Sequence, residues 1–245
     1  MKDPAGLSLI ATLSPDEVAG LAYEWLAPSE PLQGPAPLLL LLHGAGSNEH
    51  DLLGLTPYLD GRCMMASVRA PFPSGAGAYT WYRTSHTASG PMIDEEQEDA
   101  SRRNLAAFVE HLCRSRGALA SGIFLLGFSQ GATMALSLLL DHPDRFAGAM
   151  VFGARLLPGA AAGVRDRYAG RGKPVFAAHG LLDDVVPVAR ARAMRSRLLD
   201  AGLDLEYREY ASGHDIPGQA LRDAAAWLSA RLERVAGLAP RVLQS

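Results

Sequence analysis

Residues 124–140, FLLGFSQGATMALSLLL, contain the most informative motif of the chain. It places Ser129 between Gly127 and Gly131, in the pattern G-x-S-x-G, at the junction of two apolar runs. The first run is typical of a buried strand and the second of a helix. A strand that turns into a helix within one residue leaves no room for side chains two positions away, which explains both glycines. The pattern predicts a strained serine with an exposed hydroxyl at a helix N-terminus; the alternative is an ordinary strand-to-helix turn.

Short apolar runs recur along the chain and predict the strands of a mostly parallel sheet. Hydrophobic residues occupy both faces of each run, as in strands that are buried on both sides. Residues 203–210 instead alternate between apolar and charged side chains, which is typical of a half-exposed strand nearer an edge. The predicted buried strands cover residues 37–44, 62–71, 122–129, 146–154 and 173–180.

Helical patterns fill the intervals between these strands. In residues 95–114, Leu105, Phe108, Val109 and Leu112 repeat at helical spacing and form one apolar stripe behind an acidic first turn. Alternating strands and helices predict a three-layer α/β fold with helices on both faces of the sheet. Further helices are predicted over residues 131–141, 188–200 and 219–234.

The whole chain, residues 1–245, is expected to form a single domain. Its length suits one compact α/β domain. The Gly- and Pro-rich segments 28–37 and 70–82 are interpreted as loops within that domain rather than as linkers. The N-terminal segment 1–20 and the tail 236–245 are expected to be peripheral.

Composition excludes several classes of function. A net charge of -3 provides no electrostatic attraction to nucleic acid or to an anionic membrane. The apolar runs 38–42 and 134–140 are too short to span a bilayer, so no stable membrane insertion is expected. Cys63 and Cys113 form neither a metal-binding spacing nor a disulfide framework. Together with an N-terminus that makes a poor signal peptide, this predicts a cytoplasmic location.

A serine hydroxyl needs a base and an orienting acid before it can act as a nucleophile. In folds with this turn, the order along the chain is serine, acid, histidine. Of the seven histidines, His214 alone lies beyond every plausible acid. Asp183 and Asp184 follow the predicted strand 173–180, where a carboxylate could hold the imidazole in the required tautomer. The order does not decide between the two aspartates, and either could instead cap the next helix.

An acyl-transfer site also needs hydrogen-bond donors for the oxyanion. The predicted strand 37–44 runs into His43-Gly44-Ala45-Gly46, whose small residues let a backbone approach a ligand closely. In this kind of fold, one donor is the backbone N–H of the residue after the nucleophile, here Gln130, and another comes from such a loop. The alternative interpretation is a tight turn.

Motifs spread over residues 37–232 agree with one another: LLHGAGSN (41–48), RAPFPSGAGAYTWY (69–82), IDEEQEDASRRNLAAFVEHL (93–112), GFSQGATMAL (127–136), HGLLDDVVP (179–187) and SGHDIPGQALRDAAAWL (212–228). Together they resemble the phospholipase/carboxylesterase family, the acyl-protein-thioesterase-like group of α/β-hydrolases. The resemblance implies that Ser129 is the nucleophile, Asp183 the acid and His214 the base. It also implies that the amides of Ala45 and Gln130 are the oxyanion donors.

The chain departs from the usual family motifs at two positions. Ala132 stands where GFSQGG is common, and Asp184 replaces a proline that often follows the acid. Neither change removes a catalytic group, but the second leaves an extra carboxylate beside Asp183. The resemblance also implies a hydrolase without a large cap domain. Trp81 and Tyr82 are predicted to line the substrate pocket, although Trp81 could equally belong to the core.

We therefore expect a serine esterase that cleaves carboxylic esters through an acyl-enzyme and needs no metal or cofactor. The expected partner is a small-molecule ester or thioester, and an apolar rim near the site could support a homodimer. One alternative is a thioesterase or lysophospholipase that acts on longer acyl chains. A second, from a different class, is a hydrolase-fold protein that binds a ligand without chemistry.

Overall fold

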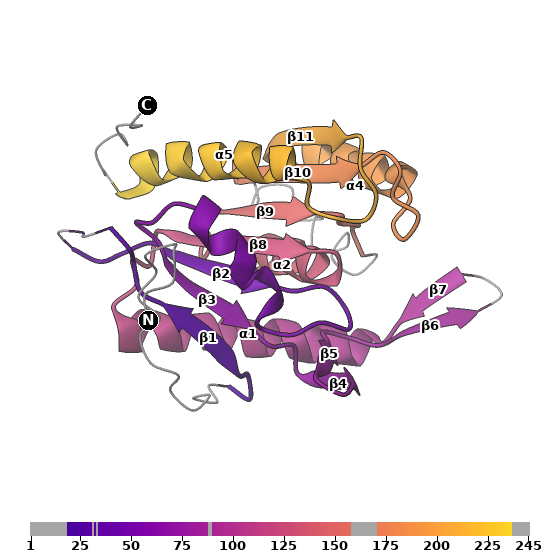
Figure 1. Cartoon of the computed structure of the whole chain (residues 1–245), viewed down its shortest axis with the longest axis horizontal. Helices are drawn as coiled ribbons and strands as arrows, with labels where there is room; N and C mark the ends of the chain where they lie inside the picture. Colours follow the sequence, from indigo (N-terminus) through magenta and orange to yellow (C-terminus); the bar gives the residue numbers. More distant parts are fainter. Residues whose placement is uncertain (1–18, 31, 33, 88–89, 158–170, 237–245) are drawn as a thin grey trace, which may run out of the picture.

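A seven-stranded sheet forms the centre of the structure, a computed structural model of the chain (Figure 1). Strands β2, β3, β8, β9, β10 and β11 pair in parallel, and β1 pairs antiparallel with β3 at one edge. Because the parallel strands run in the same direction, they all end at one edge of the sheet. In spatial order the strands are β1 (Tyr23–Leu26), β3 (Met64–Val68), β2 (Leu38–Leu42), β8 (Ile123–Phe128), β9 (Gly148–Phe152), β10 (Pro174–Gly180) and β11 (Asp204–Tyr210).

The structure describes residues 19–30, 32, 34–87, 90–157 and 171–236. Almost all of the predicted peripheral segments, residues 1–18 and 237–245, lie outside the described residues. The predicted α/β fold and its mostly parallel sheet are confirmed. The alternating segment forms β11, which is an edge strand as its pattern predicts.

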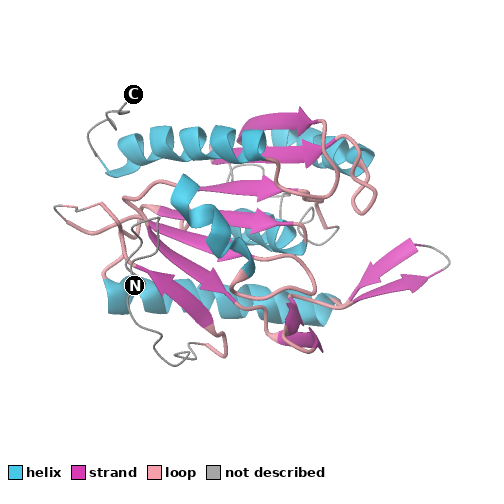
Figure 2. Ribbon diagram, viewed as in Figure 1, coloured by secondary structure: helices cyan, strands magenta, loops and turns pink. Residues whose placement is uncertain are grey.

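Helices cover both faces of the sheet (Figure 2). Helices α1 and α2 pack together on one face, with α4 against β10 and β11. Helix α5 and the 3₁₀ helix η1 contact each other on the opposite face. The sequence predictions place these α-helices correctly, with ends that differ by at most two residues. Their bounds are η1 (Asp51–Tyr58), α1 (Glu95–Arg116), α2 (Gln130–Asp141), α4 (Val188–Asp200) and α5 (Gly218–Ala236).

Local chemistry sets the ends of α1. The Asp94 side chain accepts a hydrogen bond of 3.0 Å from the backbone N–H of Gln97, which caps the first turn. The acidic residues of that turn interact favourably with the positive end of the helix dipole. Gly117 ends the helix with φ of 65°, a left-handed conformation in which glycine carries no Cβ penalty.

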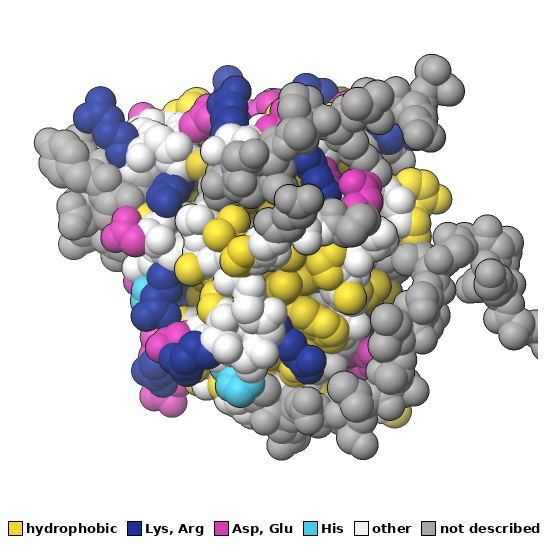
Figure 3. Space-filling model, turned by 90° about the vertical axis from the view of Figure 1, so that its left-hand side faces the viewer, with side chains coloured by type: hydrophobic (Ala, Val, Ile, Leu, Met, Phe, Trp, Pro, Cys, Tyr) yellow, Lys and Arg dark blue, Asp and Glu magenta, His cyan; other side chains and the backbone are white. Residues whose placement is uncertain are grey.

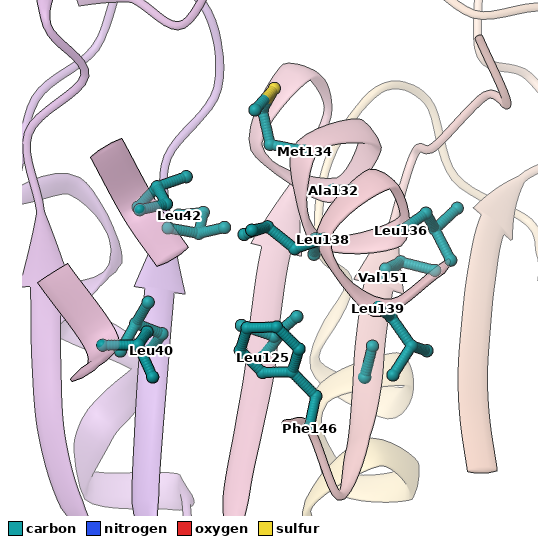
Figure 4. Close-up of a cluster of buried hydrophobic side chains, with 14 of the residues drawn as sticks. Leu40, Leu42, Leu125, Ala132, Met134, Leu136, Leu138, Leu139, Phe146 and Val151 are labelled. Atoms are coloured by element: carbon teal, nitrogen blue, oxygen red, sulfur yellow. The ribbon is translucent and has the colours of Figure 1, made fainter. Parts of the chain in front are cut away.

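Strand β2 shows how the sheet divides the core into two. Leu38, Leu40 and Leu42 pack with the helices α1 and α2, whereas Leu39 and Leu41 pack on the face covered by α5 and η1. All five side chains are fully buried, because a central parallel strand has helices above and below it. Figure 4 shows the first cluster, in which side chains of α2 lie over β2, β8 and β9.

Two short ribbons lie outside the main sheet, and the first of them forms within the segment 70–82 that the sequence predicts to be a loop. One consists of β4 (Phe72–Gly75) and β5 (Ala78–Thr80). The other, β6 (Thr84–Thr87) with β7 (Gly90–Ile93), projects from the body near the edge where the parallel strands end (Figure 1).

Hydrophobic side chains also gather at the opposite end of the molecule, where the parallel strands begin. Figure 3 shows them near the centre of that face, with charged side chains mostly toward its margins. The described residues contain no helix that is both long and apolar enough to cross a membrane.

Candidate active site

Ser129 occupies the sharp turn between β8 and α2. Its φ of 53° and ψ of -114° are strained for a residue with a side chain. Its backbone N–H donates to the carbonyl of Phe152 on the neighbouring strand β9, at 2.8 Å, and this bond holds the turn in place. A Cβ on Gly127 would lie 2.5 Å from the Gly131 carbonyl oxygen, and one on Gly131 would collide with the Leu42 carbonyl. Both glycines are therefore sterically required, as the motif predicts.

The imidazole of His214 lies between Ser129 and Asp183. Its Nδ1 is 2.7 Å from Asp183 Oδ2, and its Nε2 is 2.8 Å from Ser129 Oγ. A carboxylate only accepts hydrogen bonds, so Nδ1–H donates to it and Nε2 is left to accept from the serine hydroxyl. Three residues that are far apart in the sequence thus form one hydrogen-bonded row, at the edge where β8 and β10 end.

The two aspartates of the acid loop, residues 181–187, have different surroundings. The Asp183 side chain is 1% exposed, and its Oδ1 accepts from the backbone N–H groups of Val185 at 3.0 Å and Val186 at 2.7 Å. Asp184 is exposed and makes no side-chain contact with His214. The N-cap position of α4 is occupied by Pro187, whose side chain makes no capping hydrogen bond, so neither aspartate is the N-cap of that helix.

Glycines make room for the His214 loop. A Cβ on Gly153, at the end of β9, would lie 3.1 Å from His214 Cε1. A Cβ on Gly180, at the end of β10, would lie 2.6 Å from the Ser212 carbonyl oxygen. The Phe128 ring packs against the imidazole with centroids 4.9 Å apart, which limits the ring's movement. Neither glycine was singled out from the sequence, because the loop each one faces is distant along the chain.

The buried His43 shapes the loop after β2. The Ala70 N–H donates to His43 Nε2 at 3.0 Å, so the ring proton is on Nδ1, which donates to the Gly44 carbonyl at 2.7 Å. Burial lowers the pKa of His43, consistent with a neutral ring. The peptide bond between Gly44 and Ala45 is trans and planar, so its C=O and its N–H point in opposite directions. Because the Gly44 carbonyl is held toward the His43 ring, the Ala45 N–H points away from that ring. The next N–H, that of Gly46, donates to a carbonyl on β5.

The side chain of Gln130 ties the nucleophile turn to the segment 80–82. Its Oε1 accepts from Thr80 Oγ1 at 2.7 Å and from the Trp81 N–H at 2.8 Å. Its Nε2 donates to the Tyr82 carbonyl at 2.7 Å. This role of the Gln130 side chain could not be predicted from the sequence, because its partners lie about 50 residues away.

Trp81 and Tyr82, predicted to line the substrate pocket, are 0% and 2% exposed. The Trp81 indole N–H donates to the His43 carbonyl at 2.8 Å, so the ring supports the loop after β2 from within the core. Burial favours the core-packing interpretation that the sequence leaves open for Trp81.

The apolar rim predicted near the site falls on the acid loop. Leu181, Leu182 and Val185 are 44%, 73% and 64% exposed on either side of the buried Asp183. Exposed apolar side chains clustered in this way favour contact with an apolar group of a ligand or another protein. The homodimer stays a prediction.

The described residues contain one group with the geometry of a metal site, formed by Glu24, Glu49 and His50. Glu49 already pairs with Arg69 through two hydrogen bonds, and none of the three residues belongs to the row around His214. This group therefore supplies nothing to the candidate site.

A mostly parallel sheet with a strained serine between a strand and a helix, and an acid and a histidine on later loops, defines an α/β-hydrolase. A model of the phospholipase/carboxylesterase family matches residues 28–232, and the chain belongs to this family of ester hydrolases.

Known proteins of similar sequence and structure agree with this assignment. The hydrolase MhqD of Bacillus subtilis (strain 168) is 26% identical over 78% of this chain and 91% of its own length. Acyl-protein thioesterase 1 of Eremothecium gossypii is 28% identical over 79% of this chain and 87% of its own. The crystal structure of esterase PE8 matches with a TM-score of 0.74 and 28% identity, covering 85% of this chain and 97% of the esterase.

Proposed function

We propose that this protein is a serine carboxylesterase that hydrolyses carboxylic esters through an acyl-enzyme on Ser129. The observation that carries the proposal is the row from Ser129 Oγ to His214 Nε2, 2.8 Å, and from His214 Nδ1 to Asp183 Oδ2, 2.7 Å. Both distances suit proton transfer and orientation of the base.

In the proposed reaction, Ser129 Oγ attacks the ester carbonyl carbon while its proton passes to His214 Nε2. The Asp183 carboxylate stabilises the imidazolium that forms. The tetrahedral intermediate collapses, the ester C–O bond breaks, and His214 returns the proton to the leaving alcohol. Water then attacks the acyl-enzyme carbonyl carbon while its proton passes to His214 Nε2. The bond from the acyl carbon to Ser129 Oγ breaks, His214 returns the proton to Oγ, and the carboxylic acid leaves.

The proposed oxyanion donors are the backbone N–H groups of Ala45 and Gln130. Gln130 is the first residue of α2, so its N–H belongs to the positive end of the helix dipole. The orientation of the Gly44 carbonyl toward His43 supports the proposal for Ala45, because it directs that N–H away from the His43 ring. Each such donor typically contributes about 3 kcal/mol of transition-state stabilisation.

A second candidate is hydrolysis of thioesters or lysophospholipids with longer acyl chains. The exposed Leu181, Leu182 and Val185 beside Asp183 favour it, because a long chain that leaves the site could cover them. A series of p-nitrophenyl esters with acyl chains of about 2 to 16 carbons separates the two candidate functions. Rising kcat/KM with chain length supports the second candidate, and a fall beyond short chains supports the first.

The direct test of the proposal is the Ser129→Ala variant, assayed beside wild type on p-nitrophenyl esters. Turnover is expected to fall by about six orders of magnitude, as triad removal does in serine hydrolases. His111→Gln, which changes an exposed histidine on α1, is the matched control and should retain wild-type turnover. Equal rates for Ser129→Ala and wild type would contradict the proposal and favour a protein that binds ligands without chemistry.

We also propose a cytoplasmic location. Cys63 and Cys113 are both free thiols, as expected in a reducing compartment. Fractionation of the cells that produce the protein would test this, and recovery in a secreted fraction would contradict it.

A further inference from the structure

A second histidine, His179, lies directly behind the acid. It is the penultimate residue of β10, and its side chain is 1% exposed. Its Nε2 lies 2.7 Å from the carbonyl oxygen of Val186 and 3.4 Å from Asp183 Oδ2. The reaction proposed above gives this buried group no part.

The surroundings of the His179 ring determine where its proton sits. Both atoms near Nε2, a carbonyl oxygen and a carboxylate oxygen, are acceptors, so Nε2 carries a hydrogen and donates it. Nδ1 is buried without a hydrogen-bond partner in the part of the chain that the structure describes. A proton on Nδ1 would have no acceptor there, so the ring acts as a donor on one side only.

Val186 connects His179 to the acid. Its carbonyl accepts from His179 Nε2, and its N–H donates to Asp183 Oδ1 at 2.7 Å. Moving Val186 would therefore move the carboxylate, and the Asp183–His214 hydrogen bond depends on where that carboxylate lies. His179 Nε2 also lies 3.4 Å from Asp183 Oδ2, the oxygen that accepts from His214 Nδ1. The positive end of the His179 N–H dipole therefore interacts favourably with that oxygen.

We propose that His179 is a positioning residue, which holds Asp183 in line with His214 by donating from Nε2 to the Val186 carbonyl. The inference deepens the proposed esterase function and rests on it. His179 does not touch the substrate or the reacting atoms; it acts through Val186 and Asp183.

Ionisable groups lie near His179 on the acid loop and on β11. Asp183 lies on the acid loop, with His214 beyond it. On β11, Glu209 is the register partner of His179. Hydrogen bonds from Arg192 lower the pKa of Glu209 to about 2, so it remains a carboxylate throughout the pH range of an esterase assay. Glu209 therefore does not contribute to a change in the acid limb of the activity profile after substitution of His179.

The test compares His179→Gln with His179→Asn. A glutamine amide can place its N–H where His179 Nε2 lies, whereas the shorter asparagine cannot reach the Val186 carbonyl. His179→Gln is expected to keep kcat within about 3-fold of wild type. His179→Asn is expected to lower kcat by about 10- to 100-fold and to leave KM little changed. A loss of this size is expected when a catalytic group, here the Asp183 carboxylate, is displaced by a fraction of an ångström or more. The variant's acid limb of kcat/KM should move to lower pH, because a displaced carboxylate stabilises the imidazolium less.

Rates are expressed per site titrated with a fluorophosphonate, so that unfolded protein does not count as inactive enzyme. The inference is overturned if His179→Asn matches wild type in kcat and pH profile, or if both variants lose activity equally. The Ser129→Ala variant, assayed in parallel, separates the two proposals. If Ser129→Ala stays active, the esterase proposal fails; if it is inactive and His179→Asn behaves as wild type, only the role of His179 fails.

Discussion

Replacing Gly131 with alanine tests how tightly the nucleophile turn fits against β2. A Cβ at this position would lie 2.5 Å from the His43 carbonyl oxygen and closer still to the Leu42 carbonyl. An ordinary carbon–oxygen contact is about 3.3 Å, so the overlap with His43 alone is about 0.8 Å. Every atom in the way belongs to the backbone, so the first turn of α2 or the end of β2 has to move.

Two opposing effects determine the change in stability. Helix propensity favours alanine over glycine by about 1 kcal/mol within α2. Overpacking typically destabilises by about 1 to 3 kcal/mol, and the upper value is expected where no side chain can rotate away. We therefore expect Gly131→Ala to lower the free energy of unfolding by about 2 kcal/mol. If the turn moves away from the loop after β2, which holds the proposed donor Ala45, by about an ångström, kcat should also fall by about 100-fold.

Urea denaturation and p-nitrophenyl ester hydrolysis measure these two effects. Gly54→Ala is the matched control, because Gly54 has open space around the same added atom. The control should keep wild-type stability and activity. If Gly131→Ala is as stable and as active as Gly54→Ala, the turn is not constrained as described, and the steric reason for the G-x-S-x-G glycines fails.

Three further predictions concern buried polar groups. Asp60 accepts two side-chain hydrogen bonds from Arg62 and one from Ser229, so Asp60→Asn should lower the free energy of unfolding by about 3 to 5 kcal/mol in urea; an unchanged midpoint would contradict this. Burial raises the pKa of Asp60, but the bonds from Arg62 and Ser229 outweigh it and leave the pKa below 3.8. The pKa of Asp60 is lower in the folded than in the unfolded protein, so its stabilising effect is present above about pH 4 and is lost as the pH falls through the folded pKa. Wild type should therefore lose its advantage in stability over Asp60→Asn in acid. A difference that stays constant with pH would count against the pairing. Gln130→Leu should destabilise by at least about 2 kcal/mol, because it removes the buried partner of the Trp81 N–H and of two other groups; a melting temperature equal to that of wild type would show that these bonds contribute nothing.

Most of the correctly predicted elements depend on patterns within a few neighbouring residues of the sequence. The two apolar runs around Ser129 and the flanking glycines indicate the β8–α2 turn, because the steric conflict lies within five residues. The bounds predicted for α4, residues 188–200, match the structure, in which Pro187 is the N-cap and Ala191, Met194 and Leu198 form the buried face. Strand β1 was missed, since its four residues are too few to show a period and its pairing with β3 is long-range.

Predictions that depend on distant partners were weaker. Chain order left Asp183 and Asp184 as alternatives, and only the family resemblance favoured Asp183. Packing distinguishes them, because Asp183 is buried against the N–H groups of its own loop and Asp184 is exposed. The contacts of Gln130 and His179 could not be predicted, since nothing near either residue in the sequence indicates what folds against it.

Covalent labelling with a fluorophosphonate, followed by mass mapping of the modified peptide, shows directly whether Ser129 is an activated nucleophile. One equivalent of label per chain is expected, carried by Ser129, with no label in Ser129→Ala. Labelling should be much slower in His214→Gln, because Nε2 of the imidazole accepts the serine proton. An unlabelled protein, or a label on any other residue, would contradict the claim that Ser129, His214 and Asp183 form an activated nucleophile.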